Sequence, residues 1–233
     1  MKTKIELLIL VIMFLLSSFL IYTFVEPNTK DYTVSEDEIN FKNEYEEING
    51  KKIENTDYSY MNISIQDNNA VEYKDETEII DILKTGTGVI YFGFPECPWC
   101  RNLVPVLVNT ISDYSAGPIY YFNARSIRDT KSLDENGNIV VEKEGTKEYY
   151  EIVDILKDHL GSYDGLNDES IKRLYFPTVV FVKDGEIKQV HIGTVDSQED
   201  PFTPLNEEQN TELVSMLEGG IESTFDIMCD ESC

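Results

Sequence analysis

The most constraining feature of this chain is an uninterrupted apolar run, Val89 to Phe94, that leads into a closely spaced pair of cysteines. A short continuous apolar run is typical of a central strand that is buried on both faces. The segment that follows, Pro98 to Ser112, has the pattern of a helix. Cys97 and Cys100 therefore fall at a junction between a buried strand and a helix.

The rest of the chain alternates between strand and helix patterns. Strands are expected at 60–65, 119–122, 178–182 and 186–192, helices at 77–84, 146–160 and after Asn206, and a hairpin at 134–141 around Asn136-Gly137. This order predicts an α/β fold with a central mixed sheet flanked by helices. A long insertion, Asp129 to Ile171, carries one of the helices and separates the third strand from the fourth.

The amino terminus carries nineteen consecutive uncharged residues, Leu7 to Val25. A helix needs roughly 20 apolar residues to cross a bilayer, so residues 1–25 are expected to form a transmembrane signal anchor. The run exceeds the roughly 7–15 residues of a cleavable signal core, and no small-residue cleavage site follows it. Lys2 and Lys4 are expected on the cytoplasmic side. The rest of the chain would then be extracytoplasmic, at the cell membrane.

Acidic residues outnumber basic residues by 44 to 19, which gives a formal net charge of −25. A surface this negative repels phosphate groups and argues against nucleic-acid binding. Residues 26–56 are rich in Glu, Asp, Asn and Lys, and we expect them to form a solvated acidic tether. The folded domain is expected over residues 57–228, and a cysteine-containing tail over 229–233.

The spacing of the cysteine pair points to redox chemistry. Two cysteines separated by two residues can close a small disulfide ring at a helix start. The sulfur of Cys97 would then lie near unpaired backbone N–H groups and the positive end of the helix dipole. Both stabilise a thiolate, which is the nucleophile in disulfide exchange. We therefore expect Cys97 to be the nucleophile and Cys100 the resolving cysteine, with no organic cofactor.

A structural zinc site and a structural disulfide are the alternatives for this pair. Zinc would need two further nitrogen or sulfur ligands. The candidates form no recognisable second half-site; they are His159, His191, Cys229 and Cys233. A structural disulfide is uncommon at a strand-to-helix junction. The pair is therefore expected to be redox-active and to hold no metal.

Two stretches of the chain resemble the signatures of the thioredoxin superfamily. VIYFGFPECPWCRNLVPVL (89–107) resembles its active-site segment, and Pro105 matches the proline that kinks the active-site helix. YFPTVVFVKDGEIKQVHIGTV (175–195) resembles the second signature, in which Pro177 matches the cis-proline facing the active-site disulfide. The resemblance covers roughly residues 60–228 and implies a thioredoxin-like fold. It also implies that the backbone of Phe176 is free to pair with an extended substrate.

The chain departs from the thioredoxin pattern at two places. Tyr91 stands where thioredoxin has a buried acid, and Glu96 to Cys100 (ECPWC) replaces its WCGPC. A proline directly after the first cysteine is closer to glutaredoxins and to some disulfide-forming enzymes. These departures leave the reduction potential and the direction of the reaction open. The whole chain is most similar to membrane-attached or exported thioredoxin-like proteins of Gram-positive bacteria, a group that includes bacteriocin transport accessory proteins.

Three lesser features each allow more than one interpretation. Cys229 and Cys233 could form a structural clasp, a second redox pair that relays electrons to Cys97 and Cys100, or a metal site. Trp99 is either a packing residue or an apolar platform for substrate. Arg101 either stabilises the thiolate of Cys97 or is solvated.

The sequence as a whole predicts a membrane-tethered extracytoplasmic thiol–disulfide oxidoreductase. Its partners would be exported cysteine-containing proteins or a membrane thiol-redox partner. Two other classes of function remain. One is an accessory module for peptide export, whose groove beside Pro177 would hold an unfolded chain. The other is a chaperone for a soft metal ion such as copper(I), bound through CPWC or through CDESC (229–233).

Overall fold

The computed structural model of the chain describes residues 33–225. The expected signal anchor, residues 1–25, and the cysteines Cys229 and Cys233 lie outside these residues. Within residues 33–225, no helix is both long enough and apolar enough to cross a membrane.

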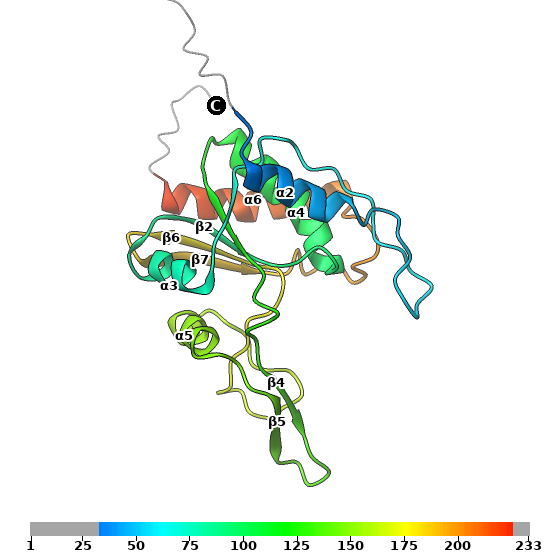
Figure 1. Cartoon of the computed structure of the whole chain (residues 1–233), viewed down its shortest axis with the longest axis vertical. Coiled ribbons are helices and arrows are strands. Elements are labelled where there is room, and N and C mark those ends of the chain that lie inside the picture. The colour runs from blue at the N-terminus through cyan, green and yellow to red at the C-terminus, as the bar shows by residue number, and fades with distance from the viewer. Residues whose placement is uncertain (1–32, 226–233) are drawn as a thin grey trace, which may run out of the picture. The chain divides into compact units, whose positions relative to one another are not determined.

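The central sheet has five strands in the order β1-β3-β2-β6-β7 (Figure 1). Strands β1, β3 and β2 pair in parallel, whereas β6 is antiparallel to β2 and β7 is antiparallel to β6. The strand bounds are β1 (Val71–Tyr73), β2 (Gly88–Phe92), β3 (Ile119–Phe122), β6 (Thr178–Lys183) and β7 (Glu186–Ile192). The chain is therefore an α/β protein with a mixed central sheet, as the order of elements predicted.

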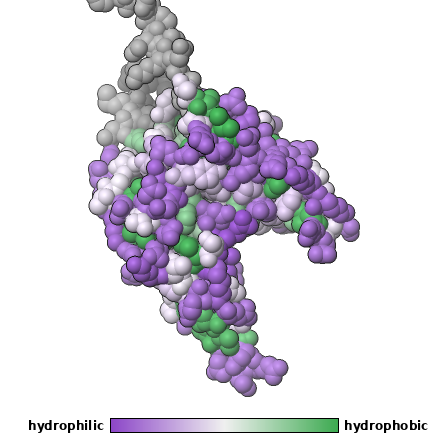
Figure 2. Space-filling model, viewed as in Figure 1, coloured by the Kyte–Doolittle hydropathy of each residue, from purple (hydrophilic) through white to green (hydrophobic). Residues whose placement is uncertain are grey.

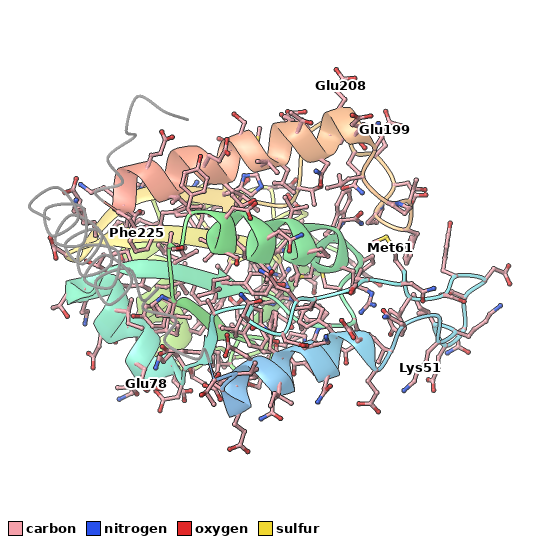
Figure 3. All side chains as sticks on the ribbon, turned by 90° about the horizontal axis from the view of Figure 1, so that it is seen from above. Lys51, Met61, Glu78, Glu199, Glu208 and Phe225 are labelled. Atoms are coloured by element: carbon pink, nitrogen blue, oxygen red, sulfur yellow. The ribbon has the colours of Figure 1, made fainter. Side chains whose placement is uncertain are left out.

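Helices cover both faces of this sheet. On one face lie α2 (Glu36–Glu46), α4 (Pro98–Asp113) and α6 (Glu207–Thr224), and on the other lie α3 (Glu76–Thr85) and α5 (Lys147–Leu156) (Figure 1). Figure 3 looks onto the first face, where α6 (orange), α4 (green) and α2 (blue) run side by side. The flanking helices predicted from the sequence are thus confirmed.

Strand β2 contributes to both hydrophobic layers because successive side chains of a strand point to opposite faces. Val89 and Tyr91 lie in the core beneath α2, α4 and α6, whereas Ile90 and Phe92 lie in the core beneath α3 and α5. Every residue of β2 is buried. Burial on both faces accounts for the continuous apolar run in the sequence.

The insertion between β3 and β6 begins with a separate antiparallel ribbon of β4 (Thr130–Leu133) and β5 (Ile139–Lys143). The Asp134 carboxylate accepts hydrogen bonds from the backbone N–H groups of Asn136 and Asn138, at 2.8 Å each. Gly137 has a φ of 81°, which glycine adopts without steric cost. The hairpin predicted around Asn136-Gly137 is therefore present.

The ribbon exposes apolar side chains, visible as a hydrophobic patch towards its end (Figure 2). These are Ile139, Val140 and Val141 of β5. After the ribbon, α5 covers the sheet and ends at Leu156, four residues before the predicted end at Leu160. The insertion therefore contains both the predicted hairpin and one of the predicted helices.

The strand predicted at 60–65 is wrong, because the first strand of the sheet is β1 at Val71–Tyr73. The alternation in that segment is real, since Ile63 and Ile65 are buried in the core. Their backbone groups, however, bind side chains rather than a neighbouring strand. Asn49 exchanges two hydrogen bonds with the backbone of Ile63, and the Glu46 carboxylate accepts one from the N–H of Ile65. Side-chain docking thus replaces strand pairing here.

The acidic tether predicted over residues 26–56 is wrong for its second half, which folds onto the domain. Helix α2 begins at a capping box made by Ser35 and Glu38. Its aromatic residues Phe41 and Tyr45 are 1% and 0% exposed in the core. Its polar composition concealed this, because acidic side chains also dock: Asp37 accepts a hydrogen bond from the backbone N–H of Tyr73.

Candidate active site

The two central cysteines lie at the junction between β2 and α4. Cys97 is the N-cap residue of α4, and its sulfur accepts a hydrogen bond from the backbone N–H of Cys100 at 3.3 Å. Pro98 occupies the first turn, where the missing N–H costs nothing. Both cysteines are free thiols. The helix start therefore stabilises the Cys97 sulfur with an otherwise unpaired N–H group.

The pKa values of the two thiols are shifted in opposite directions. The pKa of Cys97 is lowered from its ordinary value of 9.0, first by its hydrogen bond with the Cys100 thiol and further by backbone N–H groups of the helix start, against the effect of burial. Burial raises the pKa of Cys100 well above 9.0, and the neighbouring Cys97 raises it further. Cys97 therefore loses its proton at a lower pH than Cys100 does, and it is the better suited of the two sulfurs to react as a thiolate.

The backbone before Pro177 faces Cys97. The Phe176–Pro177 peptide bond is cis, as the resemblance implied. The thiol of Cys97 donates a weak hydrogen bond to the carbonyl oxygen of Phe176, with 3.7 Å between sulfur and oxygen. The structure thus brings Cys97, Cys100, Phe176 and Pro177 together, although 79 positions separate Cys97 from Phe176.

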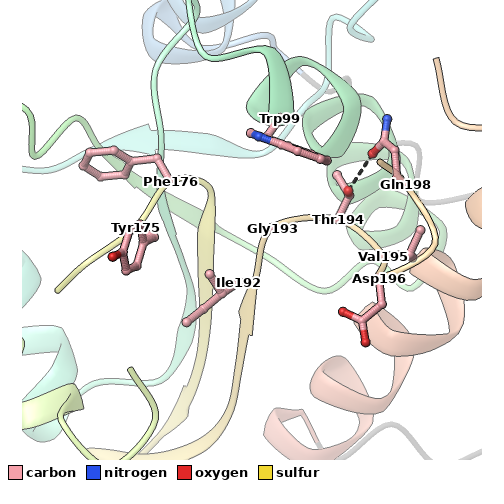
Figure 4. Close-up of a pocket in the computed structure, with 9 residues that line it drawn as sticks. All are labelled: Trp99, Tyr175, Phe176, Ile192, Gly193, Thr194, Val195, Asp196 and Gln198. Atoms are coloured by element: carbon pink, nitrogen blue, oxygen red, sulfur yellow. Dashed lines mark hydrogen bonds between the residues drawn. The ribbon is translucent and has the colours of Figure 1, made fainter. Parts of the chain in front are cut away.

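A pocket of about 310 Å³ opens beside the cysteine pair, between the start of α4 and the end of β7 (Figure 4). Trp99 and Phe176 are among the residues that line it, and the hydroxyl of Thr194 donates to the side-chain oxygen of Gln198 at 2.6 Å. The remaining lining residues are Tyr175, Ile192, Gly193, Val195 and Asp196. Trp99 is partly buried: its side chain packs against the core and also lines this pocket.

Arg125 is a cation whose charge acts on Cys97, and the sequence analysis did not identify it. Its positive charge contributes to the lowered pKa of Cys97. The guanidinium stacks 3.9 Å from the centre of the Phe94 ring and forms an ion pair with Glu96 at 3.0 Å. Arg125 follows β3, whose end meets the end of β2 only in the folded sheet. No local pattern in the sequence could have indicated it.

Arg101 takes neither of the roles expected from its position. Its side chain is 1% exposed, so it is not solvated. The guanidinium donates to the carbonyl oxygens of Met61, Tyr45 and Pro95 and to the side chain of Asn49. It therefore holds the N-terminal segment against the loop that precedes Cys97, rather than facing the thiolate.

Two comparisons bear on the identity of the site. No protein-family model matches the chain, and no curated protein matches it as a relative. Among residues 33–225, no group of three or more His, Cys, Asp or Glu side chains is arranged to hold a metal ion. Cys229 and Cys233, for which a metal was one interpretation, lie outside that range.

The lowered pKa of Cys97 predicts a specific pH dependence of alkylation. In the reduced chain, iodoacetamide is expected to modify Cys97 with a half-maximal rate below pH 9.0, because only the thiolate reacts. Cys100 is expected to stay unmodified over the same range. Peptide mapping by mass spectrometry after short pulses measures both residues in one sample. A Cys97 rate that rises only above pH 9.0 would contradict the assignment.

Proposed function

We propose that this protein is a thiol–disulfide oxidoreductase that works through Cys97 and Cys100. The observation that carries the proposal is the contrast between the two sulfurs. Cys97 is acidic, sits at a helix start and faces the Phe176 carbonyl beside a pocket. Cys100 is fully buried, with a raised pKa. One sulfur is suited to attack a substrate, and the other to resolve the product.

The exchange balances without any cofactor. The Cys97 thiolate attacks one sulfur of a substrate disulfide, a new S–S bond forms, and the electron pair of the broken bond leaves on the other substrate sulfur, which takes a proton. The Cys100 thiol loses its proton and attacks Cys97. This second step closes the Cys97–Cys100 disulfide and releases the remaining substrate sulfur as a thiol. Two electrons pass from the protein to the substrate, and the reverse sequence oxidises a substrate dithiol.

The architecture supports the finer interpretation of a thioredoxin-like fold. The strand order β1-β3-β2-β6-β7, a dithiol at the start of the helix after β2, and a cis-proline before β6 resemble that family's arrangement. The β4–β5 ribbon and α5 would be an insertion into it. We include in the proposal the membrane anchor at residues 1–25 and an extracytoplasmic location, on the apolar run and its flanking lysines.

The proposed substrates are exported cysteine-containing proteins or a membrane thiol-redox partner. The pocket is lined by Trp99 and Phe176, and the Phe176 carbonyl is held only by a weak hydrogen bond from Cys97, which an extended polypeptide could replace. The same groove would serve the alternative function, an accessory module for peptide export. Substrate binding that survives in full, together with biological activity, in a Cys97→Ser variant would favour that alternative.

An equilibrium redox titration tests the oxidoreductase directly. The full-length chain is equilibrated against glutathione or dithiothreitol buffers, acid-quenched and mapped by mass spectrometry. We expect one reversible two-electron couple at Cys97 and Cys100. A midpoint near roughly −270 mV would indicate a reductase and one near roughly −120 mV an oxidant. The absence of a reversible couple at this pair would overturn the proposal.

A further inference from the structure

Two tyrosine hydroxyls lie under the cysteine pair, where the protein interior is otherwise apolar. The hydroxyl oxygens of Tyr45 and Tyr91 are 2.7 Å apart and hydrogen-bonded. Tyr45 comes from α2 and Tyr91 from β2, and both side chains are fully buried. The Tyr91 hydroxyl also packs in the same core cluster as Cys100, where it lowers the pKa of the Cys100 thiol against the larger, opposite effect of burial. The three groups form a row from α2 to the resolving cysteine.

The position of the Tyr91 hydroxyl is fixed by its surroundings. A Cβ atom on Gly93 would lie 2.0 Å from the Tyr91 hydroxyl oxygen, so only glycine leaves room for the ring at that point. Gly93 begins the short loop that carries the chain from β2 to Cys97. The hydroxyl is therefore enclosed between the active-site loop and α2, and its position is restricted by both.

Helix α2 is also tied to the redox helix through the backbone. Arg101, the residue after Cys100, donates from its guanidinium to the carbonyl oxygen of Tyr45 at 2.9 Å. Tyr45 is thus held at two points: its hydroxyl is bonded to Tyr91, and its backbone carbonyl is bonded to Arg101.

We propose that the Tyr91 hydroxyl, oriented by Tyr45, is the hydrogen-bond donor that stabilises the Cys100 sulfur when it becomes a thiolate, so that α2 is part of the redox centre. This inference rests on the proposed dithiol exchange. In this proposal Tyr91 acts directly on the reacting sulfur, and Tyr45 acts through Tyr91 as a positioning residue. In the chain of hydroxyls, Tyr45 donates to Tyr91 and Tyr91 donates to Cys100, and each bond polarises the next.

The chemistry of the resolving step gives this donor a role. Cys100 must lose its proton before it can attack the mixed disulfide on Cys97, and burial opposes the negative charge that results. The groups that act on its sulfur are Cys97 at the N-cap of α4, the backbone of Phe94, Tyr91 on β2, Tyr45 on α2 and Tyr121 on β3. None of these is a carboxylate. Burial raises the pKa values of the tyrosines, so they are donors of hydrogen bonds and not bases.

The test separates the two sulfur reactions in time. The full-length chain with Cys229 and Cys233 replaced by serine is reduced and mixed with 5,5′-dithiobis(2-nitrobenzoate). Attack by Cys97 releases a first equivalent of thionitrobenzoate, and attack by Cys100 on the mixed disulfide releases a second. We expect Tyr91→Phe to slow the second release about tenfold at pH 7 and to raise its pH midpoint by about one unit. Tyr45→Phe is expected to slow it about threefold.

Controls distinguish this effect from a loss of packing. Tyr149→Phe removes a buried hydroxyl from the other layer of the core and is expected to leave both releases unchanged. The double variant Tyr45→Phe/Tyr91→Phe is expected to match Tyr91→Phe alone, since Tyr45 acts only through Tyr91. If Tyr91→Phe does not fold, Tyr45→Phe gives the same comparison.

The outcomes are separable. A second release that stays within twofold of the parent rate in Tyr91→Phe and Tyr45→Phe would overturn the inference and leave the exchange intact. A parent chain that releases no second equivalent would remove the proposed exchange and, with it, this inference. A Tyr45→Phe effect that persists in full without the Tyr91 hydroxyl would show that Tyr45 acts by packing and would also overturn it.

Discussion

Replacing Cys97 by serine is expected to lower the rate constant of disulfide exchange at least about a thousandfold, because a serine hydroxyl is not ionised at neutral pH and is a poor sulfur nucleophile. The loss should be equally large with protein and small-molecule disulfides, since the defect lies in the attacking atom. Stopped-flow measurement with oxidised glutathione and with a disulfide-bonded protein checks this.

Replacing Cys100 by serine is expected to give a different defect at the same site. Cys97 still attacks, but nothing resolves the product, so a covalent mixed disulfide should accumulate in stoichiometric amount. Non-reducing electrophoresis and intact-mass measurement detect it. The contrast follows from geometry, because Cys97 faces the Phe176 carbonyl at the pocket whereas Cys100 is 0% exposed.

The matched control for both variants is the replacement of Cys229 and Cys233. If the central cysteines were only structural, Cys97→Ser and Cys100→Ser would change stability and neither would trap a partner, whereas the control would change neither property. A mixed disulfide that forms at Cys100 in the Cys97→Ser variant, with normal turnover, would reverse the assigned order of the two sulfurs.

The cysteine site could be predicted from sequence because its signals are local. A buried strand, a helix start and a two-residue spacing all fall within residues 88–113, and each depends on its immediate neighbours. The contribution of Phe176 and Pro177 came from a second continuous signature. The two-residue spacing and the helix start also supply what lowers the pKa of Cys97, namely the Cys100 thiol and backbone N–H groups, whereas the raised pKa of Cys100 comes from burial in the folded core.

The N-terminal part could not be predicted because its signals are not local. Helix α2 has only two core aromatics among eleven residues, so its composition is that of a solvated segment. Contacts with residues far along the chain hold this helix in place. Asp37 accepts a hydrogen bond from the backbone N–H of Tyr73, and Arg101 donates one to the carbonyl oxygen of Tyr45. Arg125 escaped notice for the same reason, since it reaches the site only through the pairing of β3 with β2.

These long-range contacts make the second large expected effect a loss of stability at Arg101. The guanidinium is buried and has no carboxylate partner among residues 33–225; it binds instead three carbonyl oxygens and Asn49. Burial lowers the pKa of the guanidinium below its ordinary value, so keeping the charge has a cost. The opposing effect is larger, because each carbonyl left without a donor costs about 1–3 kcal/mol.

Arg101→Met is therefore expected to lower the free energy of unfolding by about 3 kcal/mol, and Arg101→Lys by a similar amount, because a compact ammonium cannot reach all the acceptors of a planar guanidinium. Urea unfolding followed by circular dichroism measures the change, and amide hydrogen exchange should show that residues 36–46 lose protection first. Lys157→Met, at an exposed ion pair on the other side of the sheet, is the control and is expected to change stability by less than about 0.5 kcal/mol. A value for Arg101→Met within 1 kcal/mol of the parent would mean that the carbonyls find water instead, and that α2 is held by Phe41 and Tyr45 alone.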